Sequence, residues 1–169
     1  MAKINIVLHE PEIASNTGNI GRTCVAAGAD LHLIEPLGFV LNEKALKRAG
    51  MDYWDRLSVT RYLDYEEFLE KHPGAKIYYA TTKGPRTYAD VQYEDGCFIM
   101  FGKESAGIPE EILAANPDTC IRIPMIGDTR SLNLGNSAAI ILYEALRQHG
   151  FEKMEQKGHP RTFEWDEKK

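Results

Sequence analysis

The chain has 169 residues, 43% of them hydrophobic and 27% charged, which is typical of one globular domain and too short for two ordinary ones. No apolar stretch approaches the ~20 residues of a membrane-spanning helix, and residues 1–12 lack a signal-peptide pattern, so we expect a cytoplasmic protein that does not contact a membrane. The net charge of −5 gives no support for nucleic-acid binding, although a local basic patch could still bind RNA.

The three cysteines, Cys24, Cys97 and Cys120, are widely spaced and stand in apolar surroundings. They form no CxxC pair and no other pattern of metal ligands. The sequence therefore predicts buried, reduced thiols and no metal site.

The first part of the chain predicts a strand, a helix and a second strand. Residues 3–9 (KINIVLH) form the nearly continuous apolar run of a strand buried on both faces of a parallel sheet. A helix should follow, with Asn16 or Thr17 as its N-cap and Gly28 at its end. Residues 31–35 (LHLIE) predict the second strand, so this segment is expected to form a βαβ unit.

The middle of the chain continues the alternation. Residues 42–48 predict a helix start whose cations, Lys44, Lys47 and Arg48, favour a solvated face over a phosphate-binding patch. Tyr53 and Trp54 are expected to pack on the domain. A strand over 58–62 and a helix over 64–71, capped by Asp64, should come next.

Another strand is expected over residues 76–82, followed by the loop KGPRTYAD. Lys83 and Arg86 flank its Gly-Pro pair. Because ligands bind at the C-terminal ends of strands in open parallel sheets, these two cations are better candidates for RNA or phosphate binding than the helix lysines.

Residues 96–102 (GCFIMFG) predict the most apolar strand, and Pro109 suits the first position of the helix that follows. Glu104 lies in the loop between them. It is either an acidic surface residue or one that pairs with a cation or orients a loop. The charged tail after residue 150 contains three large aromatic residues, which suggest docking on the domain: Phe151, Phe163 and Trp165.

The last strand (119–124) and the last helix (136–148) are joined by a loop of unusual composition. This loop offers hydroxyls, amides, a guanidinium and a glycine just before a helix N-terminus, where free backbone N–H groups suit a polar or anionic ligand. Simple helix capping explains one of its amides or hydroxyls. The whole set favours a ligand site.

The alternation of strands and helices predicts a single α/β domain with a mostly parallel sheet and helices on both faces. There is no GxGxxG, no GxxxxGK[ST], no zinc-deaminase pattern and no GxSxG elbow. Three polar, glycine-containing loops remain to bind a ligand.

Those loops are NTGNIGR (16–22), FGKESAGIP (101–109), and IPM (123–125) followed by SLNLGNSAAI (131–140). In order and spacing they resemble the three motifs of the SpoU branch of the SPOUT RNA methyltransferases. Together with LHLIEPLGF and the short length, they are similar to the small tRNA (cytidine/uridine 2′-O)-methyltransferases of the TrmL type. The resemblance covers residues 3–150, so we expect a methyltransferase domain over 1–155 and a tail over 156–169.

The resemblance implies a C-terminal trefoil knot and a homodimer whose sites are completed near the subunit interface. It also implies transfer of a methyl group from S-adenosyl-L-methionine, giving S-adenosyl-L-homocysteine, to the 2′-hydroxyl of the wobble cytidine or modified uridine in the anticodon loop of tRNA. Two alternatives stay open. One is the same chemistry on ribosomal RNA, and the other is a catalytically silent module that binds RNA or the cofactor.

Site residues follow from the resemblance, position by position. The implied catalytic residues are Arg22, Glu104, Ser131 and Asn133. The implied cofactor-binding residues are Ala80, Thr81, Gly102, Ile123, Met125, Ser131, Leu132 and Asn136. The implied RNA-binding residues are Arg22, Lys83, Arg86 and Arg130. Tyr143 is a weaker candidate for the interface or the active site.

The resemblance nominates Arg22 as the general base. A guanidinium has a pKa above ~12 and stays charged in proteins, so we interpret Arg22 as a cation that binds the adjacent phosphate and stabilises the developing alkoxide. The proton would then leave through a phosphate oxygen or water.

Overall fold

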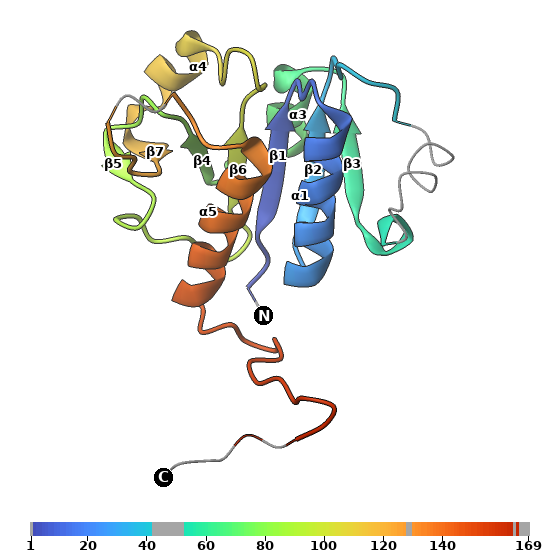
Figure 1. Ribbon diagram of the computed structural model, residues 1–169. Helices are drawn as coiled ribbons and strands as arrows, with labels where there is room; N and C mark the ends of the chain where they lie inside the picture. The colour runs from blue at the N-terminus through green and yellow to red at the C-terminus, as the bar shows by residue number, and fades with distance from the viewer. Residues whose placement is uncertain (1, 42–52, 128–129, 164, 166–169) are drawn as a thin grey trace.

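The computed structural model describes residues 2–41, 53–127, 130–163 and 165. This part of the chain forms a parallel seven-stranded sheet in the order β3-β2-β1-β6-β4-β7-β5, flanked by helices (Figure 1). The strands are β1 (Asn5–His9), β2 (Asp30–Ile34), β3 (Val59–Tyr62), β4 (Ile77–Ala80), β5 (Arg86–Thr87), β6 (Phe98–Phe101) and β7 (Cys120–Arg122). The helices are α1 (Ala14–Ala27), α3 (Tyr65–Lys71), α4 (Glu110–Ala115) and α5 (Leu134–Gln148), with short 3-10 turns η1 (Trp54–Arg56) and η2 (Pro117–Thr119). The predicted α/β class with a parallel sheet is confirmed.

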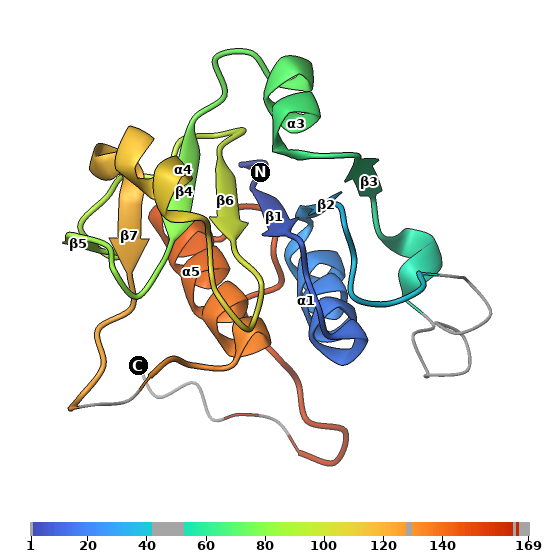
Figure 2. The same ribbon diagram turned by 90° about the horizontal axis from the view of Figure 1, so that it is seen from above.

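Both faces of the sheet are apolar because successive strand side chains point to opposite sides. In β1, Ile6 and Leu8 belong to the core beneath α1 and α5, whereas Val7 belongs to the core on the other face. That second core also contains Phe68 of α3, and Ile112 of α4 packs against it. Figure 2 shows α1 and α5 on one side of the sheet and α3 on the other. Helices therefore cover both faces, as predicted.

The strand order gathers four loops at one edge. β6 lies between β1 and β4, and β4 lies between β6 and β7, all with the same direction. The segments that leave the C-terminal ends of β1, β6, β4 and β7 therefore start side by side. Two of them lead into α1 and α5, which pack on the same face (Figure 2).

The start of α1 differs from the prediction. The helix begins at Ala14, with Ile13 at the N-cap and no capping side chain, so the prediction that Asn16 or Thr17 caps it is wrong. The Asn16 amide bonds to distant loops instead, and Thr17 is 1% exposed. The predicted end is confirmed, because Gly28 adopts a left-handed φ of 67° there.

The loop predicted after β4 contains a short strand, β5, which pairs with β7 at the sheet edge. Gly84 makes this approach possible, since a Cβ there would lie 2.7 Å from the carbonyl carbon of Ile121. Local composition could not show this pairing, because it depends on a strand that comes more than 30 residues later.

Several smaller predictions can be compared directly. Asp64 caps α3 by accepting from the Glu67 N–H at 2.8 Å, as predicted, and all three cysteines are free and buried. Pro109 is the N-cap of α4 and not its first residue. Trp54 packs against the core as expected, while the helix start predicted over 42–48 lies outside the described residues.

The three tail aromatics behave differently from one another. Phe151 packs against the core, with its ring centroid 6.5 Å from that of Tyr143. Phe163 and Trp165 are exposed and contact each other edge to face, with ring centroids 4.9 Å apart. In the described part of the tail, only the first aromatic docks as expected. No helix among the described residues is long and apolar enough to span a membrane.

Candidate functional site

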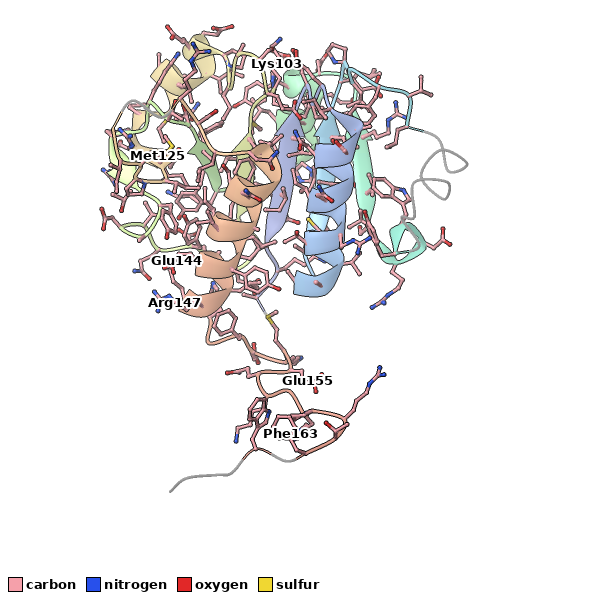
Figure 3. All side chains as sticks on the ribbon, in the orientation of Figure 1. Lys103, Met125, Glu144, Arg147, Glu155 and Phe163 are labelled. Carbon is pink, nitrogen blue, oxygen red and sulfur yellow. The ribbon has the colours of Figure 1, made fainter. Side chains whose placement is uncertain are left out.

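A cleft of about 510 Å³ opens at the C-terminal edge of the sheet. Its walls come from the loops that follow β4, β6 and β7 and from the first turns of α1 and α5. Figure 3 shows two of its lining residues, Lys103 and Met125, at this end of the molecule and Phe163 of the tail far below. The cleft therefore lies where the sequence predicts a ligand site.

Most of the predicted site residues line this cleft. They are Ala80, Thr81, Lys83, Gly102, Glu104, Ile123, Met125, Arg130, Ser131, Leu132 and Asn133. Four candidate residues are not among the lining residues: Arg22, Arg86, Asn136 and the weaker candidate Tyr143. The structure thus brings the second and third motif loops together at one cleft, and it leaves Arg22 of the first outside.

A chain of side-chain hydrogen bonds joins the three motif loops. One carboxylate oxygen of Glu104 accepts from Asn16 Nδ2 at 2.9 Å, and Asn16 Oδ1 accepts from Asn133 Nδ2 at 3.0 Å. Asn133 Oδ1 then accepts from the backbone N–H groups of Gly135 and Asn136 and so caps α5. The prediction that one of the loop amides is a helix cap is confirmed for Asn133.

The direction of this chain is set by charge. A carboxylate only accepts hydrogen bonds, so Glu104 requires the NH₂ group of Asn16 to face it. The Asn16 oxygen must then face Asn133, whose own oxygen is left for the helix N–H groups. Glu104 and the N-terminus of α5 stand at the two ends of this series of hydrogen bonds. Together they determine the orientations of both amides.

The sequence predicts Asn16 as a helix cap and as a member of the first motif loop, but it does not predict that Asn16 joins the loops. Its partners are 88 and 117 residues further along the chain, so no local pattern reveals them. Lys103 and Ser105 also line the cleft without having been predicted to do so. Their position inside the FGKESAGIP motif was the available signal.

The loop after β6 is held in a tight turn. Lys103 and Gly107 form an antiparallel bridge, and Gly107 has a φ of 76°. A Cβ on Gly102 would lie 2.0 Å from the Gly107 carbonyl carbon. A glycine is therefore required at position 102 for this wall of the cleft to close.

Arg22 is exposed on α1, and its guanidinium carbon lies 4.9 Å from the centroid of the Tyr53 ring. The Tyr53 hydroxyl in turn donates to the Gly18 carbonyl at 2.5 Å. This places the Arg22 charge over an aromatic ring on the outer side of α1. Arg22 is not among the residues that line the cleft of its own chain, whereas Glu104, Ser131 and Asn133 are.

Several cations near the cleft have carboxylate partners. Lys83 pairs with Glu110, and Lys103 pairs with Glu10 at 2.8 Å. Farther out, Arg86 approaches Asp118 at 3.4 Å. These ion pairs are exposed or half-exposed, so each contributes little stability in water. The phosphates of a polyanion could therefore replace the carboxylates as partners of these cations.

The ionisable side chains among the described lining residues are Lys83, Lys103, Glu104 and Arg130. Neither a histidine nor a cysteine is among them. The cleft is thus built to bind and orient charged and polar groups, and its only described carboxylate is committed to neighbouring N–H donors.

Comparisons with known proteins agree with this geometry. The profile of the SpoU rRNA Methylase family matches residues 3–143. The chain is 49% identical to the tRNA (cytidine(34)-2′-O)-methyltransferase of Escherichia coli K12 over 149 residues, which cover 88% of this chain and 95% of that protein. A solved structure concerned with 2-OH methylation of C/U34 on tRNA is 41% identical, with a TM-score of 0.83 over 89% of this chain and 98% of the other. An AdoMet-bound rRNA methyltransferase from Sinorhizobium meliloti is 28% identical, with a TM-score of 0.73 over 86% of this chain and 56% of the other.

Proposed function

The chain belongs to the SpoU RNA methylase family, and from this premise we propose that it methylates the ribose 2′-hydroxyl of the wobble pyrimidine in tRNA. The observation that carries the proposal is the convergence of the second and third motif loops on one cleft, in a chain 49% identical to a tRNA (cytidine(34)-2′-O)-methyltransferase over nearly its full length. The expected nucleoside is cytidine or a modified uridine. The reaction would take place in the cytoplasm.

The cleft suits S-adenosylmethionine as methyl donor. Its volume falls in the range of ~300–1,000 Å³ that holds ligands of this size. Ile123, Met125 and Leu132 provide apolar surface for a nucleobase, while Thr81 provides a hydroxyl. When bound, S-adenosylmethionine supplies a methyl group that its sulfonium makes electrophilic.

The chain's own residues must align the hydroxyl and stabilise its developing negative charge. We assign Ser131 and Asn133 to the ribose side, because both are exposed and line the cleft just before α5. Arg130, also exposed in this loop, is assigned to a phosphate of the RNA. Lys83 and Arg86 would contact the RNA after exchanging their carboxylate partners for phosphates.

Arg22 needs a second subunit to fulfil its predicted role. Because Arg22 lies outside the cleft of its own chain, we propose a homodimer in which the partner subunit's Arg22 completes the site. As a permanent cation it would bind a phosphate beside the reacting ribose and stabilise the alkoxide, while the proton leaves through a phosphate oxygen or water.

Two variants test the role of this cation. Arg22→Ala should lose methyl transfer. If Arg22→Lys retains near-normal transfer, a positive charge at this position is sufficient. If Arg22→Lys is as inactive as Arg22→Ala, bidentate hydrogen bonding by the guanidinium is required.

Mixed dimers test the shared site. Arg22→Ala and Ser131→Ala proteins, each inactive alone, should regain activity when refolded together, because each heterodimer carries one intact pair of residues. No recovery in a verified heterodimer would contradict a site built from two subunits.

The substrate is tested by methyl transfer from labelled S-adenosylmethionine to bulk tRNA of cells that lack this protein, with the product nucleoside identified by mass. A 2′-O-methylated pyrimidine at the wobble position is expected. Transfer to ribosomal RNA alone would mean that the protein is an RNA methyltransferase whose substrate is ribosomal RNA. Cofactor binding without transfer to any RNA would favour a silent module.

A further inference from the structure

The loop after β1 and the loop after β6 hold each other through Glu12. The backbone N–H of Glu12 donates to Glu104 Oε2 at 2.8 Å. In return, the Glu12 carboxylate accepts from both the backbone N–H and the hydroxyl of Ser105, each at 2.8 Å. Residues 12 and 104–105 are therefore tied by three hydrogen bonds that run in both directions.

These bonds fix the position of Glu104 from two sides. One carboxylate oxygen is taken by Glu12 N–H, and the other by Asn16 Nδ2 at 2.9 Å. Glu12 itself does not line the cleft, whereas Glu104, Ser105 and Asn16 do. Glu12 can therefore affect the site through the residues that it holds and through the charge that it places near Lys103.

Building on the proposed function, we propose that Glu12 is a positioning residue for methyl transfer. It anchors Ser105 and thereby sets the Glu104 carboxylate, which orients the Asn16 and Asn133 amides at the substrate side of the cleft. Without the Glu12 carboxylate, the loop after β6 becomes more mobile. The Glu104 carboxylate then no longer stays in place to accept from Asn16.

The hydrogen-bond chemistry predicts an asymmetry between two glutamates. A glutamine at position 12 keeps both bonds to Ser105, since its oxygen accepts from the backbone N–H and its NH₂ group donates to the hydroxyl oxygen. A glutamine at position 104 cannot keep both of its bonds. Its two partners, Glu12 N–H and Asn16 Nδ2, are both donors, and a glutamine offers only one acceptor atom.

Glu67 provides a matched control. It also accepts one backbone N–H, that of Leu63, and one side-chain donor, Lys71. It lies on α3, which packs on the opposite face of the sheet from α1. Glu67→Ala therefore removes a comparable pair of bonds without touching the cleft.

The experiment compares kcat and KM for tRNA methylation in wild type, Glu12→Ala, Glu12→Gln, Glu104→Gln and Glu67→Ala. We expect kcat to fall at least about tenfold in Glu12→Ala and Glu104→Gln, through loss of orientation at the reacting groups. Glu12→Gln and Glu67→Ala should stay within about twofold of wild type, and KM for S-adenosylmethionine should change far less than kcat in all variants. Normal kcat in Glu12→Ala, or equal loss in Glu12→Gln and Glu12→Ala, would overturn the proposal.

Amide hydrogen exchange at Ser105 gives a readout that does not depend on the reaction. Exchange should accelerate in Glu12→Ala and stay at the wild-type rate in Glu12→Gln and Glu67→Ala. If wild type transferred no methyl group to any RNA, the proposed function would fail on that result. The Ser105 exchange rate would still decide whether Glu12 anchors the loop, and an unchanged rate in Glu12→Ala would refute it.

Discussion

His32 should make the stability of this protein depend on pH between about pH 6.5 and pH 4. His32 lies on β2, in the core that α3 covers, and only 6% of its surface is exposed. Its Nδ1 is 2.7 Å from the Tyr62 hydroxyl, which is also 2.7 Å from Nε2 of His72. Burial, helped by the nearby His72, lowers the pKa of His32 from 6.5 to about 4.

The sign follows from proton linkage. The unfolded chain binds a proton at this imidazole below about pH 6.5, whereas the folded protein resists it down to about pH 4. The stabilisation is therefore fully present above pH 6.5 and is lost as the pH falls through this window. At 1.36 kcal/mol per pH unit, the loss amounts to roughly 3 kcal/mol. The pKa values of His9 and His72 are lowered mainly by burial, so they act in the same direction.

The assay is denaturant unfolding at fixed protein concentration between pH 7.5 and pH 4, for wild type and for His32→Gln. A glutamine can bond to the Tyr62 hydroxyl but does not titrate. Wild type should lose roughly 3 kcal/mol more than the variant over this range. Equal losses in the two proteins would refute the assignment, because they would place the pH dependence in other groups.

Two further substitutions follow from the packing. Gly102→Ala should lower the free energy of unfolding by about 1–3 kcal/mol or more and abolish binding of S-adenosylhomocysteine in calorimetry, because its Cβ would meet the Gly107 backbone at 2.0 Å. Gly158→Ala, with open space around the Cβ, is the matched neutral control. Normal binding by Gly102→Ala would contradict the close packing at this position. Thr17→Val should raise the free energy of unfolding by about 1 kcal/mol, since the Thr17 hydroxyl is buried without a hydrogen-bond partner among the described residues. A destabilised Thr17→Val protein would reveal a partner for that hydroxyl.

The elements that the sequence predicted well are those whose signals are local. Residues 3–9 are a nearly continuous apolar run, and Asn5–His9 within it form a strand buried on both sides. Gly28 ends α1 in a left-handed conformation, and Asp64 caps α3 with its own carboxylate. Each of these outcomes depends on residues within a few positions, so the pattern carries the information.

The failures share a different cause. Asn16 has the composition of a helix cap, but its partners Glu104 and Asn133 come from other loops of the fold. The sequence analysis assigns Glu12 no role, and its bonds to Ser105 form only when the loop after β6 folds against it. These contacts arise only when the strand order brings the loops together, which no local pattern encodes.

The predictions for the candidate site also divide into those that the motifs carry and those that depend on the folded arrangement. The motif loops predicted which residues gather at the cleft, and most of them do. The motifs could not show that Arg22 stays outside its own chain's cleft, because this depends on the direction in which one turn of α1 faces. The roles of the gathered residues remain predictions for the variants described above.

The central claim is tested most directly with two synthetic anticodon stem-loops that differ at one atom. One carries a normal ribose at position 34, and the other carries a 2′-deoxyribose there. The account predicts transfer of one labelled methyl group to the first and none to the second. Equal labelling of both would contradict it, because the methyl group would then reside on another atom.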